Sequence, residues 1–420
     1  TVLDSVELPG SVSTIVGSTV HGGKVFLAQW VQNPGDATAQ LCTYVVRPNG
    51  NKIDQVAAAT TIIPLATVLK TSAVQFDKVQ GLWMGDHRLA WFIPCARRLD
   101  DYCWRWVYGW YAPNGCPPPD VIARRHRDSA GWGDAVCALV CAVTVAPQMI
   151  ITAPDPLSIR AGNAGGEAML LATSRAYADN GRLFFSSTQK VDNDGADLDE
   201  ASVTAGDFSP YDGDDQPTTT RLHVLGFTDD GCLDERDHTA LPGTLVGASS
   251  ADDQGAWILC AKSETGGQAS RLVSMAYDGL MVRHRDGQSA TFSPSVTDAS
   301  NGLFLVPDTS VKPYRQSQVT GKIEALSPWH TDMCPALVRI SGSAVLASAS
   351  QWLGVARINA SRTLSPLAAQ SWAGYSTQLL SDQAAVDPQG SGAWIPAAEY
   401  GLEWLGFAAN QPAIAANAGQ

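Results

Sequence analysis

The densest group of side chains that could do chemistry is an acidic stretch between residues 191 and 216. It reads VDNDGADLDEASVTAGDFSPYDGDDQ and contains nine carboxylates but no Lys or Arg. Its first part, DNDGADLDE, brings five carboxylates together around a glycine, and oxygen-rich loops of this kind suit Ca²⁺. The candidate calcium ligands are Asp192, Asp194, Asp197, Asp199 and Glu200.

The match of this stretch to a calcium loop is partial. It resembles the Asp-Asn-Asp-Gly core of calcium-binding Asp-rich repeats, but it departs from EF-hand spacing, which requires Gly at the sixth position and Glu at the twelfth. The other interpretation is a solvated acidic loop that repels nucleic acid and surfaces other than its partners. We favour the solvated loop, and we expect no cofactor unless these carboxylates bind Ca²⁺.

A row of aromatic residues lies in YCWRWVYGWY, residues 102–111. If this segment is a strand, one face carries Trp104, Trp106, Tyr108 and Trp110, because side chains alternate along a strand. The row could stack on sugar rings or bases, or it could pack against neighbouring strands. We favour packing, because four aromatic rings left in water would form a large apolar patch.

Three arginines follow in the segment ARRHRDS, namely Arg124, Arg125 and Arg127. They could hold a phosphate, a carboxylated sugar or an acidic partner surface. A solvated loop is the simpler alternative. The net charge of −13 argues against sequence-specific binding of nucleic acid, because affinity for the phosphate backbone requires neutralisation by Lys and Arg.

Common catalytic motifs are missing from the sequence. It contains no HExxH, GxSxG, Walker or haem-attachment motif, and no pair among its seven histidines has the spacing of metal ligands. These absences favour a protein that is not an enzyme, although an active site built from distant residues would leave no local motif.

The nine cysteines indicate reduced thiols more than disulfides. An odd number leaves at least one thiol free, and Cys137 and Cys141 lie in an apolar run where Cys acts as a small hydrophobic residue. Cys95 and Cys103 flank a predicted hairpin and could pair. We favour mostly reduced core thiols in a protein that folds in the cytoplasm.

The elements that must position these groups recur along the chain. The tetrapeptide GAWI occurs at residues 255–258 and 392–395, and a turn followed by a short apolar run recurs at intervals of 41 to 74 residues. A second predicted strand often follows and ends in Asn-Gly or Asp-Gly, which closes hairpins. The eight apolar runs begin at Lys24, Arg88, Ala135, Arg182, Ala256, Leu303, Ala344 and Ala393, of which the Ala135 run is the weakest.

Repeats made only of short strands at this spacing resemble the β-propeller superfamily. The resemblance covers most of the chain through the eight runs and names no subfamily, because WD dipeptides are absent. It implies an all-β fold: a single β-propeller domain, residues 1–420, of seven or eight four-stranded antiparallel blades. The acidic stretch is then a loop insertion at about residues 188–219, between predicted strands Leu183–Ser187 and Leu222–Phe227.

Two further features concern the closure and the core of this fold. Residues 1–8, TVLDSVEL, alternate like a strand outside the repeats, and we predict that they pair into the last blade and close the ring. Trp257 and Trp394, in the two GAWI copies, should occupy equivalent strands and lie buried between blades. No apolar run approaches the length of a transmembrane helix, so we expect no membrane insertion.

Two classes of function fit these observations. The first is a non-enzymatic structural or docking propeller, made in the host cytoplasm, that binds other subunits of a larger assembly. We favour a bacteriophage virion component, such as a tail-hub, tail-tip or surface protein, and a start at Thr1 fits removal of a preceding Met. The alternative is a secreted propeller that binds or cleaves glycans, including those of a host surface.

Overall fold

Strands make up most of the chain that the computed structural model describes. The described residues are 13–21, 24–49, 52–68, 72–97, 136–146, 149–152, 156–160, 168–191, 218–228, 232–250, 256–263, 270–277, 282–290, 298–300, 302–317, 319–341, 343–349, 352–371, 385–386, 392–396 and 402–406.

These strands build seven antiparallel sheets, numbered 1 to 7 in chain order. Sheet 1 has the order β1 (Ser13–His21), β2 (Lys24–Val31), β3 (Thr38–Asn49) and β4 (Lys52–Pro64). Sheet 2 has the order β10-β8-β7-β5, with β6 also paired to β7 and β9 to β8. Its strands are β5 (Ser72–Val74), β6 (Gln80–Gly85), β7 (Arg88–Arg97), β8 (Val136–Ala146), β9 (Met149–Thr152) and β10 (Leu157–Arg160). The short helices α1 (Leu65–Val68) and η1 (Phe76–Lys78) lie between β4 and β6 in the chain.

Sheet 3 has the order β11-β13-β14-β15, with β12 also paired to β13, and the remaining sheets follow chain order. The strands of sheet 3 are β11 (Ala168–Thr173), β12 (Tyr177–Asp179), β13 (Arg182–Val191), β14 (Thr218–Phe227) and β15 (Leu233–Leu241). Sheet 4 contains β16 (Thr244–Ser250), β17 (Ala256–Ser263), β18 (Ser270–Tyr277) and β19 (Val282–Ala290). Sheet 5 contains β20 (Asp298–Ser300), β21 (Leu303–Pro307), β22 (Val311–Gln316) and β23 (Ile323–Ala325). Sheet 6 contains β24 (Leu337–Ser341), β25 (Ala344–Ala349), β26 (Trp352–Ile358) and β27 (Leu364–Ser371), and sheet 7 contains β28 (Ala385–Val386), β29 (Gly392–Pro396) and β30 (Leu402–Gly406).

The predicted all-β class is confirmed, and the antiparallel sheets are compatible with a propeller-like fold. Seven of the eight predicted runs are strands that belong to seven different sheets. The run at Ala135 is different, because it corresponds to β8, which pairs with β7 inside sheet 2. Both strands are apolar along their length because other sheets cover both faces, so the repeat signature marks two strands of one sheet.

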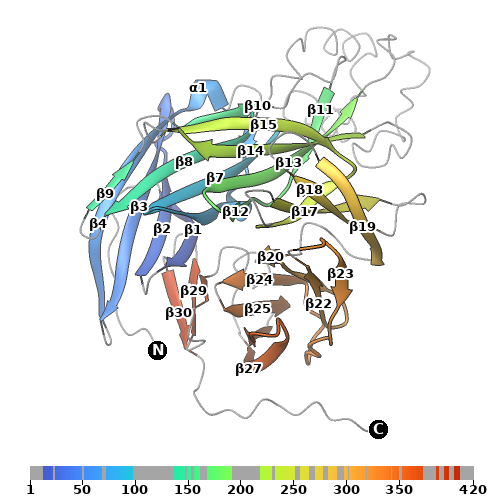
Figure 1. Ribbon diagram of the computed structural model, residues 1–420. Coiled ribbons are helices and arrows are strands. Elements are labelled where there is room, and N and C mark those ends of the chain that lie inside the picture. The colour runs from blue at the N-terminus through green and yellow to red at the C-terminus, as the bar shows by residue number, and fades with distance from the viewer. Residues whose placement is uncertain are drawn as a thin grey trace, which may run out of the picture.

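The sheets follow one another around the molecule (Figure 1). One strand of each sheet contacts one strand of the next: β1 contacts β6, β6 contacts β12, β12 contacts β16, β16 contacts β20, and β20 contacts β24. Strand β28 lies against both β25 and β1, so sheet 7 is the neighbour of sheets 6 and 1. The chain thus brings its first and last sheets together.

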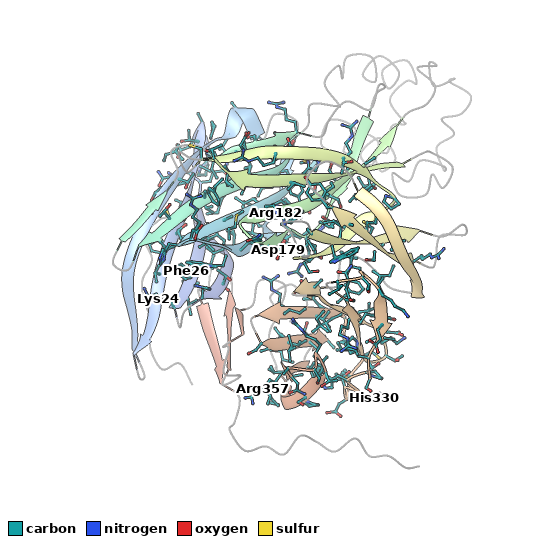
Figure 2. The ribbon with its side chains drawn as sticks, in the orientation of Figure 1. Lys24, Phe26, Asp179, Arg182, His330 and Arg357 are labelled. Carbon is teal, nitrogen blue, oxygen red and sulfur yellow. The ribbon has the colours of Figure 1, made fainter. Side chains whose placement is uncertain are left out.

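Tight hairpins join neighbouring antiparallel strands in sheets 2 and 3. Between β6 and β7, Asp86 and His87 have φ of 47° and 60°, and between β12 and β13, Asn180 and Gly181 have φ of 45° and 75°. Two successive left-handed residues match the twist of antiparallel strands, and Asn, Asp and Gly adopt them at low cost. Figure 2 shows Asp179 and Arg182 close together at the second of these turns, where their side chains lie 3.8 Å apart.

Large aromatic residues packed on glycines hold neighbouring sheets together. Trp91 on β7 is fully buried, and a Cβ at Gly17 on β1 would lie 3.3 Å from its ring. The indole N–H of Trp91 also donates to the hydroxyl of Thr43 on β3, at 2.9 Å. One side chain therefore combines close packing and a hydrogen bond between sheets 1 and 2.

The predicted equivalence of the two GAWI segments is confirmed for the strands. Trp257 lies on β17 and Trp394 on β29, which occupy the second position of sheets 4 and 7. Trp257 is buried, as predicted. The side chain of Trp394 lies outside the described part of the structure, so its burial stays a prediction.

Most of the described thiols are buried in the core, as the sequence indicated. Free, buried cysteines are found at Cys42, Cys95, Cys137, Cys141 and Cys260, whereas Cys334 is exposed. Burial raises the pKa of Cys95 to about 12, and burial followed by the proximity of Cys95 raises the pKa of Cys141 to about 12. These thiols are protonated and shielded from solvent in the folded protein.

We expect alkaline pH to destabilise the fold. In the unfolded chain a thiol ionises near its ordinary pKa of 9.0, whereas folding holds Cys95 and Cys141 protonated to about pH 12. Their contribution is therefore fully present below pH 9 and is lost as pH rises toward 12. The melting temperature should fall between pH 8 and pH 11. The fall should be smaller in the Cys141→Ala variant, once the loss of stability that the substitution itself causes at pH 8 has been subtracted. An equal fall in both proteins would contradict this assignment.

Iodoacetamide mapping at pH 8 should modify Cys334 before any of the five buried thiols.

Candidate functional site

The candidate residues from the sequence fall outside the described part of the structure. This holds for the aromatic row and for the three arginines, which lie between residues 98 and 135. It also holds for the five candidate calcium ligands between residues 192 and 217. Their proposed roles stay predictions. Within the described residues, no group of three or more His, Cys, Asp or Glu side chains could hold a metal ion.

The strands that border the acidic insertion were predicted correctly but are longer than expected. Strands β13 and β14 pair in unbroken register from Arg182↔Gly226 to Lys190↔Thr218. The predicted insertion at 188–219 therefore includes strand residues at both ends, and the segment between the strands is 192–217. Polar residues such as Thr188 and Thr218 continue the ladder, because backbone hydrogen bonds there do not depend on an apolar side chain.

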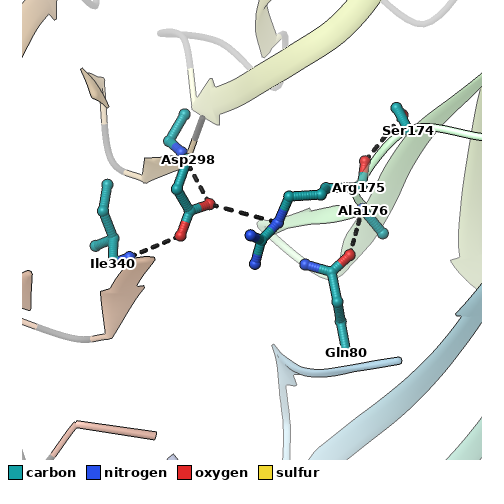
Figure 3. Close-up of polar contacts among 7 residues, drawn as sticks. Gln80, Ser174, Arg175, Ala176, Asp298 and Ile340 are labelled. Atoms are coloured by element: carbon teal, nitrogen blue, oxygen red, sulfur yellow. Dashed lines mark hydrogen bonds and ion pairs between the residues drawn. The ribbon is translucent and has the colours of Figure 1, made fainter. Parts of the chain in front are cut away.

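Polar side chains from three sheets and a backbone N–H from a fourth form what we call the central polar cluster (Figure 3). It consists of Gln80 on β6, Arg175 before β12, Asp298 on β20 and the backbone N–H of Ile340 on β24. The Nε atom of Arg175 lies 4.0 Å from Oδ1 of Asp298, and both side chains are less than a tenth exposed. The cluster therefore joins sheets 3 and 5, which are not consecutive in the chain.

Hydrogen bonds extend this cluster to further sheets. The N–H of Ile340 donates to Oδ2 of Asp298 at 2.6 Å, and the N–H of Ala299 donates to Oδ1 at 3.0 Å. Oε1 of Gln80 accepts from the N–H of Ala176 at 2.8 Å. A buried carboxylate is costly without a cation and N–H donors, and these contacts offset that cost for Asp298. Sheets 2, 3, 5 and 6 are linked through these contacts.

A second cluster, the Ser-His-Glu array, lies on one face of sheet 3. The hydroxyl of Ser187 on β13 is 2.8 Å from Nε2 of His223 on β14, and Nδ1 of His223 is 2.7 Å from Oε1 of Glu235 on β15. The ring of Phe185 stacks on the imidazole, with centroids 4.7 Å apart. We assign the ring proton to Nδ1, because a carboxylate accepts hydrogen bonds and cannot donate one.

The order of groups in this array is that of a nucleophile, a base and an orienting acid. Ser187 and His223 are only 1% and 2% exposed, whereas the side chain of Glu235 is 29% exposed. In this arrangement the hydroxyl is not open to a substrate. The array instead provides hydrogen-bond partners for three polar side chains and links β13, β14 and β15.

Sequence reasoning missed both clusters because their members are far apart in the chain. Ser187 reaches His223 only because it pairs with Arg221, two residues before His223, and side chains two residues apart share a face. The available signal was a polar residue inside an otherwise apolar strand, as in RLHVLGF. That signal indicates that the polar residue has a buried hydrogen-bond partner, but it does not identify the partner residue.

The histidines are also less isolated than the sequence suggested. His21, at the end of β1, stacks on Trp83 of β6 with ring centroids 3.7 Å apart. Burial, followed by the nearby charge of His87, lowers the pKa of His21. Two neighbouring hairpins thus place two imidazoles close together, as a pair and not as a set of three metal ligands.

Comparisons with known proteins give a structural likeness but no family. No protein-family model and no curated protein sequence matches the chain. Among solved structures, the chain is similar to an acylaminoacyl peptidase from Pyrococcus horikoshii, with 8% sequence identity and a TM-score of 0.40. The match covers 91% of this chain and 49% of the peptidase, so the chain spans about half the length of that protein. In the described residues, no helix is long and apolar enough to cross a bilayer.

We expect His223→Ala to destabilise the protein by about 1 to 3 kcal/mol, because it removes the partner of a buried hydroxyl and of a carboxylate. His223→Gln should cost less, since an amide can still donate to one neighbour and accept from the other. Urea unfolding of both variants measures the difference. His330→Ala is the control, because this exposed histidine should shift stability by less than about 0.5 kcal/mol. Equal stability of the His223→Ala variant and the unmodified chain would contradict the assignment.

Proposed function

We propose that the chain is a seven-bladed β-propeller, a single domain over residues 1–420, which acts as a structural docking subunit of a larger assembly. In this proposal the N-terminal strand closes the ring at the seam between sheets 1 and 7. The assembly that we favour is a bacteriophage particle, with the propeller in the tail hub, the tail tip or the particle surface.

The observation that carries the docking role is the central polar cluster. In a propeller the innermost strands surround the axis, and here Gln80 on β6 and Asp298 on β20 make contacts with other sheets. A frame joined in this way is suited to holding surface segments in fixed positions. The partner surface in this proposal is the acidic segment 192–217, which carries many of the carboxylates behind the net charge.

The acidic segment can be removed without disturbing the ladder that borders it. Because Lys190 pairs with Thr218, the ends of the segment lie on adjacent strands, and a short Gly-Ser turn can replace residues 192–217. We expect this deletion variant to keep its melting temperature and far-ultraviolet spectrum. We also expect it to sediment free in a density gradient, whereas the unmodified chain sediments with the assembled particle.

Two other results of this experiment have definite meanings. Co-sedimentation of the deletion variant with particles would place the docking surface elsewhere, and a free unmodified chain would contradict the docking role.

Millimolar Ca²⁺ separates the two interpretations of the segment. A rise in melting temperature in the unmodified chain, absent from the deletion variant, would assign calcium ligands to it.

A further inference from the structure

One buried cation stands apart from the polar clusters described above. Among the described residues, four side chains of the Asp, Glu, His, Lys or Arg type are buried, namely Arg175, His223, Asp298 and Arg339. Arg175 faces Asp298, and His223 faces Glu235. Within the part of the chain that the structure describes, Arg339 has neither a carboxylate partner nor a hydrogen-bond acceptor.

Arg339 lies on β24, the first strand of sheet 6, in a largely apolar setting. Leu346 on β25 is directly opposite, and Leu337 and Ser348 form the next pair on the same face. All three of these neighbours are buried. The preceding residue, Val338, points to the other face, where it packs in the core shared with sheet 5. Arg339 is therefore turned away from sheet 5, among side chains that carry no charge.

An arginine cannot escape the cost of burial by losing its charge. A buried lysine or histidine can become neutral, whereas a guanidinium group stays protonated. A charge in apolar surroundings is costly unless an opposite charge compensates for it. The position of Arg339 is thus suited to an anion, and the planar fork of N–H donors matches two oxygens of a carboxylate or phosphate.

The exposure of Arg339 limits the size of this anion. The residue is 8% exposed, which gives access to a small ligand but not to a protein surface. We propose that Arg339 binds one small oxyanion of the carboxylate or phosphate class. The apolar neighbours strengthen the pairing, because they keep the local dielectric constant low. This binding site goes beyond the docking role and does not depend on it.

The test compares Arg339→Met with Arg357→Gln in the full chain. Arg357 is an exposed arginine on β26 of the same sheet, so its substitution is the matched control for the loss of one positive charge. Phosphate or acetate replaces chloride at constant ionic strength. In the unmodified chain and in Arg357→Gln, the melting temperature should rise by about 1 to 2 °C for each tenfold increase in the bound anion. Arg339→Met should lack this rise.

The stability of Arg339→Met in chloride provides a second readout. Without phosphate or acetate this variant should melt no lower than the unmodified chain, because an apolar side chain of similar length replaces an uncompensated charge. A variant that melts lower or does not fold would overturn the proposal, since the guanidinium would then be paired within the protein itself. An equal dependence on the anion in Arg339→Met and the unmodified chain would also overturn it.

Isothermal titration of the unmodified chain gives a measurement that requires no variant. Phosphate and acetate are titrated separately, so that the two classes of oxyanion are distinguished. Heat from one site per chain supports the proposal and shows which class binds. The absence of binding heat for both anions would overturn it.

Discussion

Replacing Trp257 by Ala should lower the free energy of unfolding by about 3 to 5 kcal/mol. The side chain is 5% exposed and belongs to the second strand of sheet 4. Its ring lies against Gly321 of sheet 5, where a Cβ atom would be 2.3 Å from the indole. The substitution removes packing between two sheets and leaves a cavity that neither backbone can close. Urea unfolding at constant pH measures the loss, and Trp257→Phe should cost less.

Gly321 provides the reciprocal test of this contact. Gly321→Ala adds a methyl group that overlaps the indole, at a backbone φ of +69° that favours glycine. In the Trp257→Ala background the overlap is gone and only the backbone cost remains. We therefore expect the two substitutions to couple by about 1 kcal/mol or more. Simple additivity would mean that the ring and the glycine are not in contact.

The second large effect is expected at Asp298. Its carboxylate faces the buried Arg175 and accepts N–H groups of Ile340 and Ala299. Asp298→Ala removes the anion while the guanidinium stays buried, which in other proteins costs about 3 to 5 kcal/mol. Asp298→Asn should cost less than this, because its amide oxygen still accepts one N–H. Thermal and urea unfolding of both variants provide the measurement.

Two controls make the Asp298 result specific. Asp308 pairs with Lys312 at the surface, where both side chains are about 40% exposed, so Asp308→Ala should change stability by less than about 1 kcal/mol. The double variant Arg175→Met with Asp298→Leu should recover much of the loss, since apolar pairs often replace buried ion pairs well. A stable Asp298→Ala protein would show that the carboxylate does not hold sheets 3, 5 and 6 together.

The sequence predicted the repeating units well because their signal is local. An apolar run such as LFLVP at Leu303 becomes a strand buried on both faces, and β18 and β19, which flank the Asp-Gly pair in the sequence, pair antiparallel. The same rule could not decide whether the weak run at Ala135 starts a separate unit, since β7 and β8 carry the same pattern within one sheet. An apolar pattern indicates that a strand is buried, but it does not indicate which strands belong to the same sheet.

The candidate site was harder to predict because it depends on register between distant segments. Arg175 and Asp298 are polar residues near strand ends in the sequence, with nothing local to distinguish them from solvated residues. Only the packing of sheets that are distant in the sequence brings them together. Conversely, the acidic and aromatic segments are conspicuous by composition, but composition does not fix their position relative to the sheets.

The contact between the first and last sheets also has a consequence for how the protein folds. Every other pair of neighbouring sheets is continuous in the chain, and sheets 3 and 4 are joined by only residues 242 and 243. Strand β1 meets β28 across more than 360 residues, so that contact carries the largest entropy of loop closure. Sheets can form and stack one after another as the chain emerges, whereas this seam must wait for the whole chain. We therefore expect it to be the last contact between sheets to form during synthesis.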